Sequence, residues 1–109
     1  MAAVINSRQK GKAGELELSA LLREHGFDEA RRGVQYRGSG DSPDVVGLPG
    51  DHVECKRVES GNPYDWLDQA IHDCPTDRVP VVFHRRNRRD WIVIMRANDY
   101  LRRKAGEVY

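Results

Sequence analysis

The sequence contains little cysteine and no long apolar run, and each shortage excludes a class of protein. Only two cysteines, Cys55 and Cys74, occur in 109 residues. Two are too few for a disulfide framework or for a zinc site made of four cysteines. The longest apolar stretches, such as residues 91–95, are far shorter than the roughly 20 residues that a membrane-spanning helix needs. We therefore expect a protein of a reducing compartment that does not cross a membrane.

Other familiar signals are also missing. Residues 1–12 lack the apolar segment and the small-residue cleavage site of a secretory signal, which predicts a cytoplasmic location. The histidines share no metal-ligand spacing and have no partner nucleophile, so we expect structural roles for His25, His52, His72 and His84. No repeat or linker divides the chain. A chain of this length is typical of one domain, which we place over residues 1–109.

Charge is abundant but unevenly distributed, although the formal net charge is only +1. Residues 41–77 hold nine acidic and two basic side chains, whereas residues 78–104 hold nine basic and two acidic ones. A carboxylate cluster surrounded by arginines would suit a metal-dependent enzyme that acts on a polyanion. The alternative is that the two segments pair with each other inside an ordinary domain. Charge alone favours this second interpretation, because many globular domains place opposite charges in different segments and bind nothing charged.

Apolar periodicity and capping residues predict the order αβββαββα. Asn6 or Ser7 can start the first helix and Gly26 can end it, while Asn62 and Asn98 can cap the other two helices. The expected helices cover residues 7–26, 63–74 and 98–103, and the expected strands cover residues 27–32, 44–48, 52–58, 79–84 and 91–96. The fold class is therefore α/β, a mixed sheet flanked by helices.

Two apolar stripes mark the faces that the longer helices should bury. The first helix carries Ala13, Leu16, Leu18, Leu21 and Leu22, and the second carries Trp66, Leu67, Ala70 and Ile71. Because Trp66 and Trp91 occupy apolar positions, we expect them to pack in a core or interface rather than to stack on bases. Both stripes predict helices that lie against the sheet.

The most informative residues are Asp44, Glu54 and Lys56. In a strand, alternate side chains share a face, so Glu54 and Lys56 point to one side and Cys55 to the other. If the strand before the Pro49-Gly50 turn pairs antiparallel, Asp44 comes close to Glu54 or Lys56. Two adjacent carboxylates repel unless a cation neutralises them, and oxygen ligands suit Mg²⁺ or Mn²⁺. The backbone carbonyl of Cys55 could add a ligand, and Lys56 could hold a water.

Glu15 lies at the start of the buried stripe of the first helix. A carboxylate at this position favours either a metal or a basic partner at the edge of the core. It is equally compatible with an exposed first-turn glutamate that the helix dipole stabilises.

Together these residues resemble the PD-(D/E)XK nuclease superfamily, whose common core is αβββαβ. The shared pattern is Pro43-Asp44, nine intervening residues, Glu54-x-Lys56 and a preceding helical glutamate. More narrowly, the segments that look like archaeal-type Holliday-junction resolvases and their phage relatives are Lys10-Gly11-Lys12-Ala13-Gly14-Glu15, Gly38-Ser39-Gly40 and Val53-Glu54-Cys55-Lys56.

The resemblance implies a restriction-endonuclease-like fold and a Mg²⁺-dependent endonuclease for branched DNA. It implies that Glu15, Asp44 and Glu54 carry the metal site, that Lys56 assists the water and that Gln69 lies beside the active site. It also implies a homodimer and a bacterial, archaeal or phage-infected cell. The same core resembles virus-type replication and repair nucleases that act on flaps, nicks or single strands. A catalytically silent DNA-binding module is the alternative of another class.

Arginines and lysines near these motifs are candidates for contact with DNA phosphates. A turn of four arginines interrupts the last two strands, and three basic residues precede Glu15 in what could be a mobile arm over residues 1–12. A solvated turn and a frayed terminus are the alternatives. The candidate residues are Arg8, Lys10, Lys12, Arg31, Arg32, Arg37, Ser39, Arg85, Arg86, Arg88 and Arg89.

Overall fold

The computed structural model describes residues 7–33 and 42–106, with side chains from residue 11 onward. Three helices and five strands follow one another in the predicted order αβββαββα. The elements are α1 (Ser7–Glu24), β1 (Arg31–Arg32), β2 (Val45–Val46), β3 (Asp51–Lys56), α2 (Pro63–Asp73), β4 (Val79–His84), β5 (Ile92–Ile94) and α3 (Ala97–Lys104).

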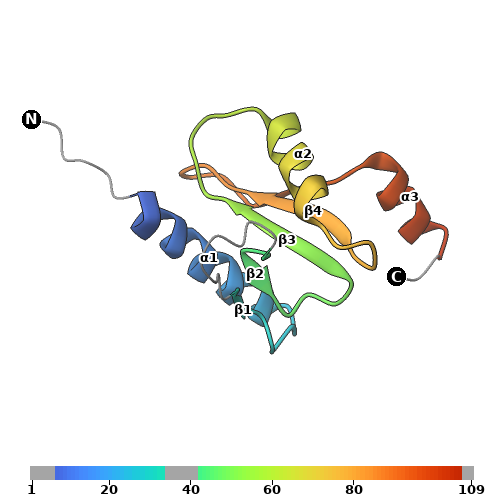
Figure 1. Cartoon of the computed structure of the whole chain (residues 1–109). Helices are drawn as coiled ribbons and strands as arrows, with labels where there is room; N and C mark the ends of the chain where they lie inside the picture. Colours follow the sequence, from blue (N-terminus) through green and yellow to red (C-terminus); the bar gives the residue numbers. More distant parts are fainter. Residues whose placement is uncertain (1–6, 34–41, 107–109) are drawn as a thin grey trace, which may run out of the picture.

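The five strands form one mixed sheet in the order β1-β2-β3-β4-β5. β3 and β4 run parallel on either side of the α2 connection, and the other neighbours are antiparallel. The β2–β3 pair is the predicted hairpin, in which Val45 lies opposite Val53. Figure 1 shows α1 and α2 on opposite faces of this sheet. The α/β class with a mixed, helix-flanked sheet is confirmed.

Helix α1 packs on the face of the sheet that carries Val45 and Val53, where Leu18 and Leu22 complete a buried cluster. It approaches β3 closely at Gly14, because a Cβ atom there would lie 2.5 Å from Cβ of Arg57. Two predicted stripe residues are wrong, since Ala13 and Leu16 are exposed. The close contact at Gly14 turns the face that carries Leu18 and Leu22 toward the sheet, and Ala13 and Leu16 lie outside it.

Helix α2 covers the other face and matches its sequence signals closely. The Asn62 side chain accepts a hydrogen bond of 2.9 Å from the Tyr64 N–H, which caps the helix as expected. Leu67 and Ala70 are buried together with Val82 of β4, and Trp66 and Ile71 pack around them. All four predicted stripe residues of α2 therefore contribute to the core.

Several strands are shorter than predicted. β1 and β2 have two residues each rather than six and five, because residues 27–30 form a turn closed by a 3.0 Å bond from Ala30 N–H to the Phe27 carbonyl. β5 is also shorter than predicted. The prediction that Asn98 caps α3 was wrong, since the helix starts at Ala97 and no side chain caps it.

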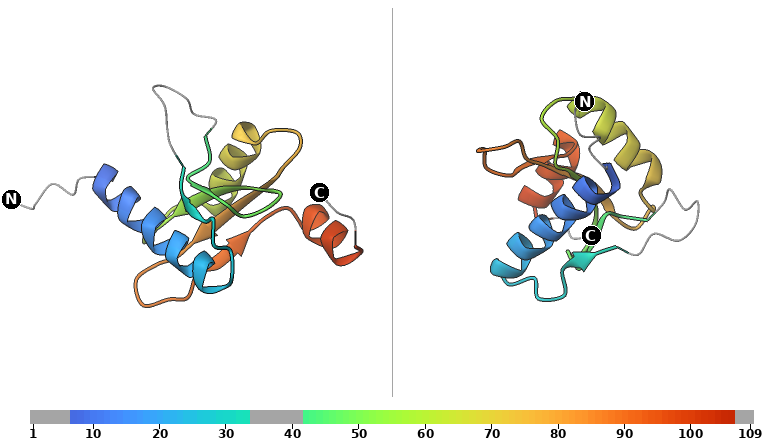
Figure 2. Two further views of the ribbon diagram at one scale, coloured as in Figure 1. Left: turned by 90° about the horizontal axis from the view of Figure 1, so that it is seen from below. Right: turned by 90° about the vertical axis from the view of Figure 1, so that its left-hand side faces the viewer.

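Helix α3 lies at one end of the sheet, away from α1 (Figure 2). Two ion pairs involve it: Asp99 accepts from Arg96 at 2.9 Å, and Arg103 pairs with the buried Asp51 of β3. The second pair joins the basic C-terminal segment to the acidic middle. Of the helices that the structure describes, none is both long and apolar enough to span a membrane.

Candidate active site

Asp44 is fixed against β3 by two hydrogen bonds. Its N–H donates to the Val53 carbonyl at 2.8 Å, and its Oδ2 accepts from the Cys55 N–H at 2.8 Å. These bonds extend the β2–β3 hairpin by one residue beyond Val45. Asp44 therefore meets the later part of β3, as the sequence predicted from the Pro49-Gly50 turn.

Asp44 and Glu54 form a carboxyl pair on one face of the sheet. Burial and a hydrogen bond with Glu54, together with the charge of Glu54 and a smaller contribution from Glu15, raise the pKa of Asp44 to about 8. The bond from the Cys55 N–H opposes this shift. With its pKa raised to about 8, Asp44 keeps its proton near neutral pH in the absence of a cation.

Glu54 has a second partner that sequence reasoning missed. His52 Nε2 lies 2.9 Å from Glu54 Oε1, and His52 is 1% exposed. The other ring nitrogen, Nδ1, is buried and has no hydrogen-bond partner in the described part of the chain. His52 precedes Glu54 by two residues, so the alternation of the strand already placed both on one face. That spacing was the available signal.

Lys56 completes this row on the same face of β3. It is half-buried and lies opposite His84 of β4 in the parallel register. Within residues 7–33 and 42–106 its ammonium group makes no hydrogen bond or ion pair. The lysine can therefore contact a water or a phosphate beside the carboxyl pair.

Cys55 offers its backbone rather than its thiol. Because its N–H bonds to Asp44, and a residue in a strand directs its N–H and C=O to the same neighbour, its carbonyl also points to the Asp44 side. The side chain points toward α1, where Sγ lies 3.6 Å from the position of a Cβ on Gly14. Burial and the charges of Asp44 and Glu15 raise the pKa of the thiol to about 12. Such a thiol is not a nucleophile.

Glu15 is half-buried at the edge of the site and is bound by a basic partner. Arg32 Nε donates to Glu15 Oε1 at 3.2 Å. Its negative charge reaches both Asp44 and Cys55. In the part of the chain that is described, no three His, Cys, Asp or Glu side chains are arranged to hold a metal together. The carboxyl pair of Asp44 and Glu54 is therefore the centre of the site.

Comparison with known families agrees with this geometry. The family described as "Phage putative PDDEXK endonuclease" matches residues 6–107, which is nearly the whole chain. The chain belongs to this family. No curated protein and no solved structure matches it significantly. The family assignment supports the PD-(D/E)XK fold and an endonuclease activity, and it does not support Holliday-junction resolution in particular.

The donor set of this member of the family fits a hard divalent cation. Mg²⁺ is usually bound through one or two carboxylates and keeps several waters, so it does not need a cage of protein ligands. Asp44, Glu54 and the Cys55 carbonyl supply that number of oxygen donors on one side of β3. The raised pKa of Asp44 shows that a second negative charge beside Glu54 is unfavourable, and a bound cation would relieve this repulsion.

One predicted active-site residue comes from helix α2. Gln69 is exposed on α2, and its Nε2 donates to Asp73 Oδ2 of the same helix at 2.9 Å. The helix buries Leu67 and Ala70 against the sheet, and Gln69 lies on the other side of the helix. Its predicted place beside the active site stays a prediction.

Two arginines predicted to contact DNA form ion pairs within the chain. Arg32 holds Glu15, and Arg85 pairs with Glu17, which also accepts from Arg57 at 3.2 Å. Burial would raise the pKa of Glu17, but hydrogen bonds from Arg85 and Arg57 keep it below its usual value. Both arginines thus form ion pairs within the chain, with carboxylates of α1.

The remaining basic candidates have different surroundings. Arg86, Arg88 and Arg89 are exposed in the β4–β5 turn, and Lys12 and Arg31 are exposed near Glu15. Residues 7–12, expected in part as a mobile arm, form the beginning of α1, which includes Arg8 and Lys10. Arg37 and Ser39 lie outside the described residues.

Proposed function

We propose that this chain is a Mg²⁺-dependent endodeoxyribonuclease that hydrolyses phosphodiester bonds in branched DNA. The observation that carries the proposal is the hydrogen-bonded pair of Asp44 and Glu54 beside Lys56 on one face of β3. Membership of an endonuclease family gives independent support. The preference for branched DNA rests on the likeness of the motifs to junction resolvases.

Asp44, Glu54 and the Cys55 carbonyl would hold the Mg²⁺, and Mn²⁺ should replace it. When bound, the cation polarises the phosphate and lowers the pKa of a water. Glu15, which Arg32 holds, contributes negative charge at the edge of the site rather than a direct bond. His52 fixes the orientation of Glu54 through Nε2.

Lys56 would hold the attacking water or take its proton, in addition to contacting the phosphate. Because the lysine has no ion-pair partner among the described residues, its charge is available to a phosphate that lies over the carboxyl pair. The expected products carry 5′-phosphate and 3′-hydroxyl ends. Arg86, Arg88 and Arg89 would contact neighbouring phosphates of the substrate.

The test is cleavage of an end-labelled four-way junction beside a flap, a nicked duplex, a linear duplex and a single strand. Each substrate is incubated with Mg²⁺ or with EDTA. Asp44→Asn should abolish Mg²⁺-dependent cleavage. Asp68→Asn on the exposed side of α2 removes the same charge and should leave cleavage unchanged.

The pattern of products decides between the alternatives. Paired incisions confined to the junction would support a resolvase and a homodimer, which light scattering on the protein–junction complex can verify. Cutting of flaps, nicks or single strands would instead indicate a replication or repair nuclease. Binding without any cleavage would leave a catalytically silent DNA-binding module and overturn the proposal.

A further inference from the structure

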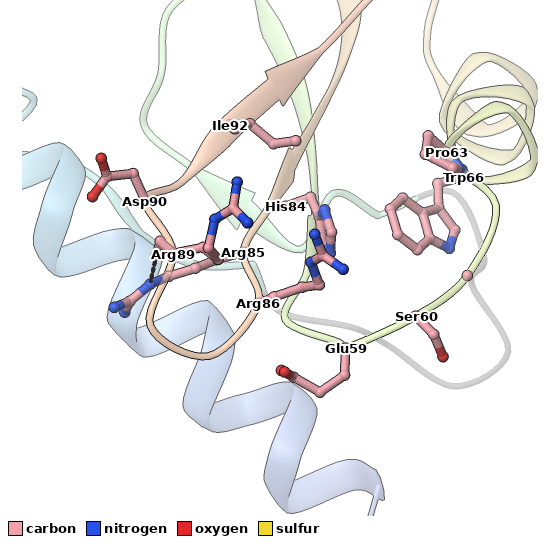
Figure 3. A pocket seen from close by; sticks show the side chains of 11 residues that line it. Glu59, Ser60, Pro63, Trp66, His84, Arg85, Arg86, Arg89, Asp90 and Ile92 are labelled. Atoms are coloured by element: carbon pink, nitrogen blue, oxygen red, sulfur yellow. Dashed lines mark hydrogen bonds between the residues drawn. The ribbon is translucent and has the colours of Figure 1, made fainter.

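A pocket of about 520 Å³ is lined by none of the residues of the carboxyl pair. It is bordered by the β3–α2 loop, by Trp66 of α2 and by the β4–β5 turn. Figure 3 shows Trp66 and Pro63 on one side of this pocket and the arginines of the turn on the other. Its size falls in the range of small-molecule sites.

The pocket is connected to the proposed catalytic lysine through the sheet register. Lys56, His84 and Ile92 form one cross-strand row on β3, β4 and β5, so they share a face. Two strand spacings, about 10 Å, separate the ends of this row. A nucleotide next to a phosphate held at Lys56 could therefore reach the pocket.

One wall of the pocket is apolar and aromatic. Trp66 and His84 lie with ring centroids 4.6 Å apart and planes tilted by 54°. Gly61, with φ at +140°, approaches so closely that a Cβ there would lie 2.5 Å from Trp66 Cζ2. These contacts hold the indole in place. Ile92, which is 52% exposed, adds apolar surface to the same pocket.

The opposite wall is cationic. Arg86 and Arg89 border the pocket, are exposed, and make no side-chain hydrogen bond or ion pair with other described residues. Glu59 also borders the pocket, where its carboxylate accepts from the Asn87 N–H at 3.0 Å and pairs with Arg57. The Glu59 bond also ties the two walls together. Asp90 lies at the far edge (Figure 3).

We propose that this pocket binds one unpaired nucleotide of the DNA substrate, with the base against Trp66 and Ile92 and a phosphate on Arg86 and Arg89. An aromatic face beside arginines suits a base and its phosphate, whereas a bare phosphate would use only the cationic wall. Bases inside a duplex are covered by their neighbours and cannot enter. The inference rests on the proposed function, and it favours substrates that contain unpaired nucleotides.

The test compares the affinity of an oligodeoxythymidine with that of an abasic strand of equal length, both in EDTA so that no cleavage occurs. The wild type should bind the intact strand roughly 10-fold more tightly than the abasic strand, given the usual gain from stacking a base on an aromatic ring. Ile92→Ser should lower this ratio, because it removes apolar surface that the base would contact. Val93→Ser alters a neighbour that is equally exposed, at 52%, on the opposite face of β5 and should leave the ratio unchanged.

Trp66 supplies a second measurement. In a Trp91→Phe protein it is the only tryptophan, and its fluorescence should be quenched by the intact strand and not by the abasic one. Trp66→Leu should lower the affinity ratio. If Trp66→Leu does not fold, the ratio measured for Ile92→Ser tests the proposal. A wild-type ratio near one, or an equal effect of Ile92→Ser and Val93→Ser, would overturn the proposal.

These experiments distinguish failure of the pocket proposal from failure of the proposed nuclease activity. Asp44→Asn should lose Mg²⁺-dependent cleavage of the substrate panel and keep the base-dependent binding ratio. If the wild type cuts nothing but retains the ratio, the proposed activity is wrong and the pocket stands. If it cuts flaps and linear duplex equally and shows no ratio, the pocket is wrong and the activity stands.

Discussion

His52 and Glu54 are joined inside the sheet by a contact of 2.9 Å between Nε2 and Oε1. The other ring nitrogen of His52, Nδ1, is buried and has no hydrogen-bond partner among the described residues. A buried polar atom without a partner is costly, and such a cost is more often found at a functional site than in an ordinary core. The contact orients the carboxylate that we propose as a metal ligand.

We expect His52→Ala to weaken Mg²⁺ binding and cleavage by roughly 10- to 100-fold, because second-sphere partners of metal ligands have effects of this size. Isothermal titration with Mg²⁺ and cleavage rates measure the two quantities. His72→Ala on the exposed side of α2 is the control and should change neither. Normal Mg²⁺ affinity in His52→Ala would remove His52 from the site.

Lys56→Ala should reduce the cleavage rate by roughly 10²- to 10⁴-fold, the range for loss of a group that moves a proton. Binding of DNA in EDTA should change little, since one of several phosphate contacts is lost. Lys104→Ala on α3 removes the same charge far from the site and serves as the control. A Lys56→Ala protein that cuts at the normal rate would show that the lysine takes no part in the reaction.

The metal-free protein should lose stability as the pH rises from about 4 to about 8. Folding raises the pKa of Asp44 to about 8, so over this interval the folded chain binds a proton that the unfolded chain has lost. Stability from this group is therefore complete at low pH and disappears above pH 8. Urea unfolding in EDTA at several pH values should show the decline, and Asp44→Asn should flatten it.

Mg²⁺ should reverse this trend by replacing the proton of Asp44. Binding near pH 7 should release a proton, so the apparent affinity should rise with pH up to about 8. Titrations in buffers of different ionisation enthalpy count the protons released. Binding with no proton release at pH 7 would mean that the cation does not displace the proton of Asp44.

Two glycines of α1 provide a matched pair that tests how closely the helix approaches β3. Gly14→Ala should destabilise the protein by about 1–3 kcal/mol, because its Cβ would lie 2.5 Å from Cβ of Arg57. Gly11→Ala has no atom within 4 Å and should stabilise the protein by about 0.5–1 kcal/mol through helix propensity. Thermal unfolding distinguishes the two, and similar effects of both changes would contradict the packing.

Features that depend on interactions between residues close in the sequence were predictable. Asn62 caps α2 because its side chain reaches a backbone N–H two residues away, and the Pro49-Gly50 turn sets the register that brings Asp44 to Cys55. The strand alternation correctly placed Glu54 and Lys56 on one face. The same reasoning applied to His52 would have placed it beside Glu54, but no partner for a lone histidine was visible.

Long-range choices were not predictable in the same way. Arg32 and Arg85 look like phosphate contacts in the sequence, yet they pair with Glu15 and Glu17, carboxylates that lie far away along the chain. Leu16 has the right spacing for the core, but the contact of Gly14 with Arg57 sets which face of α1 is buried. Gln69 was placed beside the active site by resemblance, and that placement stays a prediction.

The sequence by itself determined the order of helices and strands, the carboxylate–lysine motif of β3 and the family, because these depend on short periods, caps and spacing along one strand. Only the tertiary structure decided which charges neutralise one another and which remain available to a substrate. It also brought Trp66, Ile92 and the arginine turn around one pocket. The physical reason is that ion pairs and pockets form between segments distant in the chain, whose separation in space is set by packing and not by local pattern.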